Sequence, residues 1–300
     1  MRKTILVAGA TGNLGKRIVL ALLCKNAEVR VVVRSSSDKE KLSALEKLGA
    51  KVYKIEHWDL KELTEACLGV SCVVSSLAGL REVIVHAQIV LLNAAIAAGV
   101  PRFVPSDYSL DFTKFSDGEN RNLDLRREFH QYLDNTPILA TTIFNGAFTD
   151  LLTREMPVIL FKQKLVLYWG NADIRWNFTT MDDTAAYTAN VAIDTSTPRY
   201  LLIAGDQISP RKIRDVVNKV TMKKFRLFRV GGQRLLGVIV KIARKISRSE
   251  KELYPAWQGM QYMHNMIDER SKIEKLNNDR YPEMRWTTVK DFLTEFEKNR

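Results

Sequence analysis

The first half of the chain alternates short apolar runs with amphipathic segments. Runs rich in valine and isoleucine predict strands at residues 5–8, 29–33, 52–55, 72–76, 103–105 and 138–143. Between them, apolar side chains recur at helical spacing and predict helices at residues 14–24, 39–48, 60–68, 82–98 and 123–133. Near-continuous apolar strands separated by helices are typical of a parallel sheet covered on both faces. The pattern therefore predicts a doubly wound α/β domain.

This alternation is lost after about residue 145. Residues 161–178 form an aromatic-rich run, and a further strand is predicted at residues 200–204. Helices are predicted to begin at Asp182, Ser209, Arg234, Glu252 and Thr287. We expect a cofactor domain over residues 1–145, to which strands from 138–205 can contribute, and a smaller α-rich C-terminal subdomain over 146–300. Such a subdomain would cap the carboxyl ends of the strands, where open α/β sheets bind ligands.

The first predicted strand leads directly into the glycine-rich turn Gly9-Ala-Thr-Gly-Asn-Leu-Gly15 and then into a helix. Glycines at this spacing allow a tight turn, close approach of a pyrophosphate to the backbone, and close helix packing. The amide groups and the dipole at the start of the helix favour the anion. A strand before the turn and a helix after it complete the context that this fingerprint requires. The sequence therefore predicts a Rossmann-type dinucleotide site that includes Gly9, Gly12 and Gly15.

The end of the second predicted strand favours NADP(H) over NAD(H). Sites that prefer NAD usually place Asp or Glu here to bind the ribose 2′-hydroxyl, whereas this chain has Arg34. A guanidinium can pair with a 2′-phosphate, and Lys39 or Lys41 in the following helix can add a second positive contact.

Charge is the unusual feature of the composition. The 46 Lys and Arg residues exceed the 34 Asp and Glu residues and give a net charge of +12, whereas the 46% hydrophobic content is ordinary for a globular protein. The excess lies in residues 211–251, which hold fourteen basic and two acidic side chains. On a helix over residues 234–248, basic side chains gather in one arc and apolar side chains fill much of the remainder. The arc comprises Arg234, Lys241, Arg244, Lys245 and Arg248.

A solvated helix face over a packed apolar stripe explains the basic arc without a partner. Weak binding to an anionic membrane surface is an alternative, and nucleic acid or an acidic protein is a third. Aromatic side chains do not interleave these charges, which weakens the case for binding to single-stranded nucleic acid.

The cysteines favour a reducing compartment, and we expect a cytoplasmic location. Cys24, Cys67 and Cys72 are odd in number and lack the spacing of metal ligands, so the sequence predicts no metal site. The apolar run near the N-terminus is too short for a signal peptide.

The chain lacks the Tyr-x-x-x-Lys pair of conventional short-chain dehydrogenases, in which the lysine lowers the tyrosine pKa so that the phenol acts as an acid. None of the nine tyrosines has a lysine four positions later. Aromatic side chains of the second half predict an apolar substrate pocket or, as an equal alternative, the core of the second subdomain. They are Phe148, Phe161, Tyr168, Trp169, Trp176 and Phe178.

Several segments together resemble the NmrA-like, isoflavone-reductase-like group of atypical short-chain dehydrogenases. They are GATGNLGKRIV, VVVR, SALEKLGAKVY, CVVSSLAG, HAQ at residues 86–88, VPRFVPSDY at 100–108, NGAF at 145–148 and WNFTTMDD at 176–183. The resemblance extends from Lys3 to about Gly232. It implies an NADP(H)-binding Rossmann protein.

The resemblance also implies roles for individual residues. Positions that match cofactor contacts are Thr11, Gly12, Asn13, Leu14, Arg34 with Lys39 or Lys41, Ser76, Leu77, Gln88, Ser106 and Asp107. Tyr108 matches the loop beside the nicotinamide, and we also place it in the substrate pocket with the aromatic residues.

Active reductases of this group usually carry a lysine four residues before an Arg-Arg or Arg-Lys pair. Arg126-Arg127 matches the pair, so Asn122 occupies the position of the lysine. Asparagine can donate a hydrogen bond but supplies no proton at neutral pH. Our candidate catalytic residues are Tyr108 and Asn122, with His130 or Lys114 as alternative proton donors.

Two functions stay open at this point. The first is a reductase that transfers a hydride to a small apolar or aromatic carbonyl or conjugated compound. The second is a catalytically weak NADP(H) sensor that acts through a protein partner, which the absence of the lysine favours.

Overall fold

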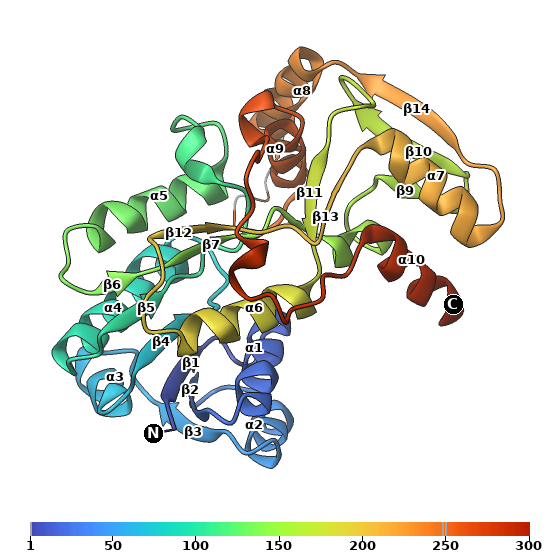
Figure 1. The fold of residues 1–300 in the computed structure, drawn as a ribbon. Helices are drawn as coiled ribbons and strands as arrows, with labels where there is room; N and C mark the ends of the chain where they lie inside the picture. The colour runs from blue at the N-terminus through green and yellow to red at the C-terminus, as the bar shows by residue number, and fades with distance from the viewer. Residues whose placement is uncertain (1, 248, 250) are drawn as a thin grey trace. The chain divides into compact units, whose positions relative to one another are not determined.

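The structure is a computed structural model that describes residues 2–247, 249 and 251–300 (Figure 1). Arg248, which the sequence places in the basic arc, lies outside the described residues. The chain divides into two compact units. The first comprises the chain up to Tyr108 with Leu125–Ile143 and Thr184–Leu201, and the second comprises Ser109–Asp124, Phe144–Asp183 and Leu202–Arg300. The second unit is about as long as the first, not smaller as expected.

The first unit is built on a parallel sheet with the strand order β3-β2-β1-β4-β5-β6. Its strands are β1 (Thr4–Ala8), β2 (Glu28–Arg34), β3 (Lys51–Ile55), β4 (Cys72–Ser75), β5 (Arg102–Val104) and β6 (Leu139–Ala140). Neighbouring strands in this order run parallel. This topology confirms the predicted doubly wound, Rossmann-type fold.

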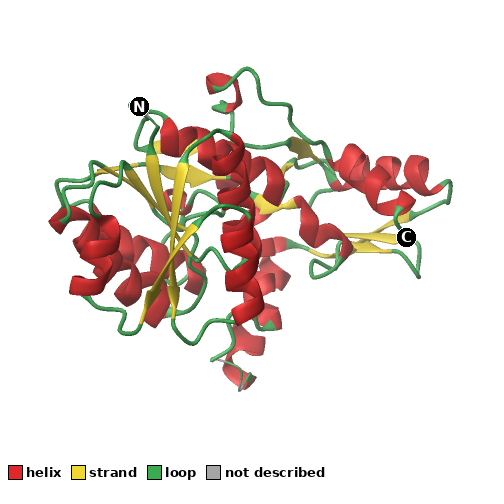
Figure 2. Cartoon of the chain, turned by 90° about the horizontal axis from the view of Figure 1, so that it is seen from below, coloured by secondary structure: helices red, strands yellow, loops and turns green. Residues whose placement is uncertain are grey.

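Helices cover both faces of this sheet, as Figures 1 and 2 show. One face packs against α1 (Asn13–Cys24) and α2 (Lys39–Lys47). The other face packs against α3 (Leu60–Cys67), α4 (Gln88–Ala97) and α5 (Arg121–Leu133). The predicted helices in this half of the chain therefore all form, with ends that differ by one or two residues.

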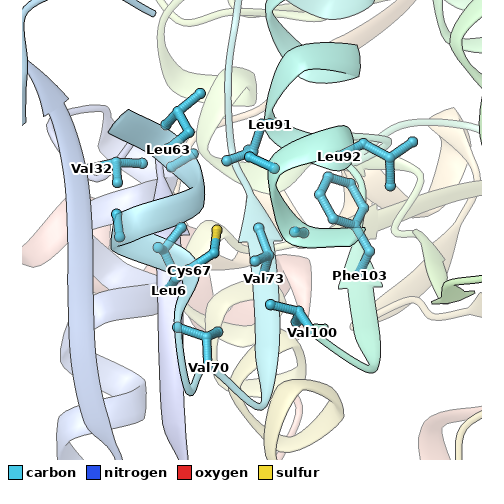
Figure 3. Close-up of a cluster of buried hydrophobic side chains, with 14 of the residues drawn as sticks. Leu6, Val32, Leu63, Cys67, Val70, Val73, Leu91, Leu92, Val100 and Phe103 are labelled. Atoms are coloured by element: carbon cyan, nitrogen blue, oxygen red, sulfur yellow. The ribbon is translucent and has the colours of Figure 1, made fainter. Parts of the chain in front are cut away.

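The core between the sheet and α3 and α4 is apolar (Figure 3). Side chains that meet there are Leu6, Val32 and Val73 from the strands, Leu63 and Cys67 from α3, and Leu91 and Leu92 from α4. Burial raises the pKa of the Cys67 thiol to about 12. This cysteine therefore stays protonated and acts as an apolar core residue.

The predicted helix at residues 82–98 consists of two parts. Glu82–Ala87 forms a π-helical turn, and the α-helix α4 begins only at Gln88. Such turns change the angular spacing of side chains and are frequent at functional sites. The change comes directly before Gln88, one of the predicted cofactor residues.

The predicted strand at residues 138–143 is interrupted. β6 pairs with β5, whereas β7 (Thr142–Phe144) pairs with β12 (Tyr200–Leu202). The Thr141 N–H donates to the Phe103 carbonyl at 3.0 Å, and the Thr142 N–H donates to the Arg199 carbonyl at 2.8 Å. The backbone therefore changes its pairing partner between these two threonines.

The second unit contains two small sheets that the sequence pattern did not predict. Their strand orders are β14-β10-β9 and β13-β11-β8. The strands are β8 (Ala147–Phe148), β9 (Ile159–Leu160), β10 (Leu165–Trp169), β11 (Trp176–Thr179), β13 (Asp206–Ile208) and β14 (Arg226–Gly231). Three of them, β8, β9 and β13, have only two or three residues, which is too few for a pattern to mark a strand. The alternation of apolar and polar residues in β11 extends over only four residues.

The later helices start near the predicted positions. They are α6 (Met181–Ile193), α7 (Pro210–Thr221), α8 (Gln233–Ile246), α9 (Ala256–Met266) and α10 (Val289–Lys298). Ser209 caps α7, and Thr288 forms a capping box with Asp291 at α10. The helix expected from Glu252 begins only at α9, because a proline at position 255 disfavours helical backbone in the residue before it.

Two basic side chains donate hydrogen bonds to the carboxyl end of α6 within the first unit. The buried Arg102 donates from Nη1 to the Val191 carbonyl at 2.8 Å. Its guanidinium also donates hydrogen bonds to the Asp194 carbonyl and the Thr197 hydroxyl. Lys3 donates from Nζ to the Ile193 carbonyl at 2.5 Å. Both side chains satisfy carbonyl groups that a helix leaves open at this end, and their charge complements its dipole.

We expect Arg102→Leu to lower the free energy of unfolding by about 3 kcal/mol, because it removes the donor to buried carbonyl groups. Urea unfolding of the purified protein measures this change. Arg81→Leu is the control, since Arg81 pairs with Glu128 at an exposed site and such a pair contributes less than about 1 kcal/mol. Equal effects of the two substitutions would contradict a structural role of Arg102.

Candidate cofactor and substrate sites

The glycine-rich turn brings the end of β1 against the start of α1. Gly9 has a φ of +82°, which favours glycine. A Cβ atom on Gly15 would lie 2.2 Å from the Gly9 carbonyl oxygen and 2.6 Å from Ser76 Oγ. Since real Cβ atoms do not approach backbone oxygens this closely, only glycine allows the helix to begin here.

This end of α1 offers backbone donors to an anion. Gly12 occupies the N-cap position with extended backbone and has no side chain to cap the first turn. The amide groups that follow, on Asn13, Leu14 and Gly15, begin the helix and need acceptors from outside it. A pyrophosphate is the ligand that such a turn binds in Rossmann folds.

Four further predicted cofactor residues lie together at the carboxyl ends of β4 and β5. Ser76 Oγ donates to the Ala8 carbonyl at 2.8 Å. Ser106 Oγ donates to the Leu77 carbonyl at 2.7 Å, and the Ser106 N–H donates to Gln88 Oε1 at 2.9 Å. The structure therefore joins the ends of these strands to the first residue of α4 by hydrogen bonds.

A cavity of about 700 Å³ lies beyond the carboxyl ends of β2 and β3. Its lining includes Arg34, Ser35, Ser36, Glu56, His57, Trp58, Glu82 and His86. Trp58 Nε1 donates to the Ala87 carbonyl at 2.8 Å, which fixes the indole in the wall of the cavity. Of the residues predicted to contact a 2′-phosphate, Arg34 lines this cavity, whereas Lys39 and Lys41 are exposed on α2 outside the lining.

Asp107 accepts hydrogen bonds in a buried network of the first unit. His130 Nε2 donates to Asp107 Oδ2 at 2.6 Å, and Thr142 Oγ1 donates to the same oxygen at 2.8 Å. Arg199 Nη2 donates to His130 Nδ1 at 2.9 Å. Because arginine only donates, Nδ1 accepts and the ring proton lies on Nε2. Both nitrogens of His130 are therefore occupied, which argues against this residue as the alternative proton donor.

The charge of Asp107 is stabilised in spite of its burial. Burial alone would raise the pKa of this carboxyl group, but contacts with His130, Arg126 and Thr142 outweigh it and lower the pKa below its usual range. Asp107 thus acts as a fixed anion that holds the loop after β5.

The hydroxyl of Tyr108 is buried within the first unit. Burial raises the pKa of this phenol. A buried phenol with a raised pKa is a poor proton donor to a ligand at the strand ends. Its burial agrees with a packing role, and the catalytic and substrate-contact roles of Tyr108 remain predictions.

Asn122 lies in the first turn of α5, within the second unit, and is only 2% exposed. Its Oδ1 accepts from Arg121 Nε at 3.2 Å, and its Nδ2 donates to the Leu253 carbonyl at 3.4 Å. The Arg121 guanidinium lies 4.6 Å from the centre of the Trp257 ring. The amide is therefore held beside a guanidinium. Lys114, the other alternative donor, bonds the Lys272 carbonyl at 3.1 Å.

Four of the six predicted pocket aromatics divide into two groups. Trp176 and Phe178 are fully buried and pack edge to face with ring centres 6.4 Å apart. They belong to the core of the second unit and do not line an open pocket. Phe148 and Trp169 are partly exposed, so a role in substrate binding remains a prediction for them.

Comparison with known proteins identifies the family. The sequence profile described as the NmrA-like family matches residues 1–293. The chain belongs to the NmrA-like family. The predicted resemblance is thus confirmed over nearly the whole chain.

Relatives of this NmrA-like protein include named reductases. Pinoresinol reductase 1 of Arabidopsis thaliana is 30% identical over 208 residues, which cover 64% of this chain and 65% of the relative. A bifunctional pinoresinol-lariciresinol reductase of Linum usitatissimum is 25% identical over 311 residues, which cover 97% and 98% of the two chains. The oxidoreductase class predicted from the sequence agrees with both.

Solved structures share the fold of this NmrA-like protein. AtPrR2 in complex with NADP+ and (+)pinoresinol superposes with a TM-score of 0.83 at 23% identity, over 99% of each chain. An isoflavone reductase gives 0.82 at 18% identity over 99% of this chain and 100% of its own. Leucoanthocyanidin reductase of Vitis vinifera, in complex with NADPH, gives 0.80 at 17% identity over 98% and 99%. The cofactors in these complexes agree with the predicted NADP(H).

We expect Asp107→Asn to destabilise the NmrA-like protein most at neutral pH. The folded pKa of Asp107 lies below the unfolded value of about 3.9. Its charge therefore contributes stability above that value, and the contribution is lost as the pH falls through the folded pKa. The variant should be less stable by about 2 kcal/mol at pH 7, and the difference should shrink as the pH falls below about 4.

Urea unfolding at a series of pH values measures this difference. Asp173→Asn is the control, because Asp173 pairs with Arg211 at an exposed site and should change stability little at any pH. A difference between wild type and Asp107→Asn that grows on acidification would mean that folding raises the pKa of Asp107.

Proposed function

We propose that this NmrA-like protein is an NADP(H)-dependent reductase that transfers a hydride to a small apolar or aromatic substrate with a carbonyl group or a conjugated double bond. Two features of the first unit together carry the proposal. Helix α1 begins after Gly12 without a side-chain cap, and Arg34 lines a cavity at the end of β2. These are the places where a Rossmann fold binds the pyrophosphate and the 2′-phosphate. The pinoresinol reductases among the relatives support an aromatic substrate.

The residues of the first unit would bind and orient the cofactor. Bound NADPH supplies the hydride. The amides that follow Gly12 would bind its pyrophosphate, and Arg34 would pair with its 2′-phosphate. Gln88 and Ser106 would hold the loop after β5 in place through the hydrogen bond between them. We further propose that Phe148 and Trp169 make apolar contacts with the substrate.

In this proposal, the strength of catalysis depends on Asn122, which stands where active reductases of the family usually carry a lysine. Its amide can donate a hydrogen bond to a substrate oxygen but carries no proton to transfer at neutral pH. This property favours a second candidate function, a catalytically weak NADP(H) sensor that acts through a protein partner. A cytoplasmic location, which the three free cysteines support, is proposed for either function.

Arg34→Asp should change the cofactor preference. We expect the Kd for NADPH to rise at least about tenfold, because the substitution replaces a charge-assisted contact with like-charge repulsion. The Kd for NADH should change much less, since NADH lacks the 2′-phosphate. Fluorescence titration measures both constants. Lys25→Asp makes the same charge change at an exposed site of the first unit and should leave the ratio of the two constants unchanged. An unaltered ratio in Arg34→Asp would remove Arg34 from the 2′-phosphate site.

Turnover tests the reductase proposal directly. We expect NADPH oxidation with members of a panel of isoflavones, quinones, enones and aromatic aldehydes, with one product formed per NADPH consumed. Asn122→Lys should raise kcat at least about tenfold by supplying a general acid, whereas Asn122→Gln, which supplies none, should give no gain. NADPH binding without turnover in any of these proteins would reject the reductase and leave the sensor.

A further inference from the structure

Helix α8 of the second unit carries an exposed apolar stripe. Its side chains are spaced three or four residues apart, so they lie along one side of the helix, and they are between 49% and 75% exposed. They are Leu235, Val238, Ile242 and Ile246. Leu236 and Val240 are buried, and α8 packs against α9. The expectation of a packed apolar stripe is therefore correct for only one side of the helix.

Basic side chains lie beside this stripe. At 100° per residue, an exposed group occupies the sector of α8 next to the apolar one. It consists of Arg234, Lys241 and Lys245. Arg244, also in the predicted arc, lies instead 5.3 Å from the centre of the Trp257 ring. The exposed surface of α8 is thus divided lengthwise into an apolar half and a basic half.

The charges on this surface are not compensated locally. On α7, Arg211 pairs with Asp173 and Arg214 pairs with Asp215. Among the residues that the structure describes, no carboxylate forms an ion pair with the three basic side chains of α8 named above. Residues 211–251 carry the whole net charge of +12, and the rest of the chain is balanced. A ligand that complements this surface is therefore negative.

The apolar half and the basic half of α8 together indicate which kind of negatively charged partner fits this surface. A second copy of this chain would bring two strongly basic regions together, which repel each other. A nucleic acid would neutralise the basic side chains but would leave the apolar stripe in water. The surface of an anionic bilayer offers negative headgroups and hydrocarbon side by side, which suits a helix divided in this way.

The length of α8 fixes how it would bind. Its fourteen residues extend for about 21 Å, and in the described part of the chain no helix is long and apolar enough to cross a membrane. The helix would therefore lie in the plane of the membrane surface.

We propose that α8 binds the surface of anionic lipid membranes. Leu235, Val238, Ile242 and Ile246 enter the boundary between headgroups and acyl chains, while Arg234, Lys241 and Lys245 contact the lipid phosphates and carboxylates. Neither set belongs to the proposed cofactor or substrate sites, so this binding is independent of the proposed reductase activity.

Co-sedimentation of the full chain with lipid vesicles tests the proposal. We expect binding to vesicles of phosphatidylcholine with added phosphatidylserine, and binding at least about tenfold weaker to phosphatidylcholine alone. Binding should also weaken as the salt concentration rises. Equal binding to the two kinds of vesicle would overturn the proposal.

Two pairs of matched variants test the two halves of the surface. Lys241→Glu/Lys245→Glu should weaken vesicle binding at least about tenfold, whereas Lys61→Glu/Lys290→Glu, with the same net charge, should bind like wild type. Val238→Ser/Ile242→Ser should also weaken binding, by about tenfold, whereas Leu68→Ser/Leu139→Ser, which removes exposed leucines elsewhere, should not. Circular dichroism and urea unfolding of each variant confirm that it is folded. If a variant and its control bind vesicles equally, the corresponding half of α8 makes no contact and the proposal fails.

Two other partners of α8, a second copy of the chain and a nucleic acid, would give different results in these experiments. A dimer in light scattering that Val238→Ser/Ile242→Ser converts to a monomer, without vesicle binding by wild type, would assign the stripe to self-association. Binding to duplex DNA without vesicle binding would assign the charges to nucleic acid. Either result would reject the membrane proposal.

Discussion

The close approach of Gly15 to the Gly9 carbonyl oxygen sets the geometry of the cofactor unit. Because neither residue has a Cβ atom, the first turn of α1 can lie against the end of β1 and against Ser76 after β4. The donors at the start of this helix then point to the edge of the sheet where the parallel strands end. Ser76 is bonded in turn to the Ala8 carbonyl, so the turn, β1 and the end of β4 form one rigid support.

Most titratable side chains of the first unit near this edge serve the structure. Asp107 holds the loop after β5 through His130 and Thr142, and Arg199 fixes the tautomer of His130. Tyr108 is buried. His130, whose two ring nitrogens are both hydrogen-bonded, has little freedom to exchange a proton with a ligand. The proposed chemistry therefore depends on hydride transfer and on positioning more than on a strong acid among these residues.

Local sequence determines some of these features and not others. The sheet and the glycine turn were predictable because strands buried on both faces, and glycines required by close contacts, leave a pattern within a few residues. The role of His130 was not predictable, since Arg199 approaches it from a segment more than fifty residues away. Most strands of the second unit were missed because they are too short to give a recognisable pattern. In β11, Trp176 and Phe178 alternate with polar residues, but only over four residues.

The sequence pattern of α8 likewise predicted only part of its structure. The separation of basic from apolar residues was visible in the sequence, but the period of a helix does not show how much of its apolar side a neighbour covers. Packing against α9 buries Leu236 and Val240 and leaves Ile242 exposed. A membrane contact at that side chain would be compatible with the proposed reaction, because apolar aromatic compounds partition into hydrocarbon whereas NADPH stays in water. A reductase held at a bilayer surface would meet both reactants.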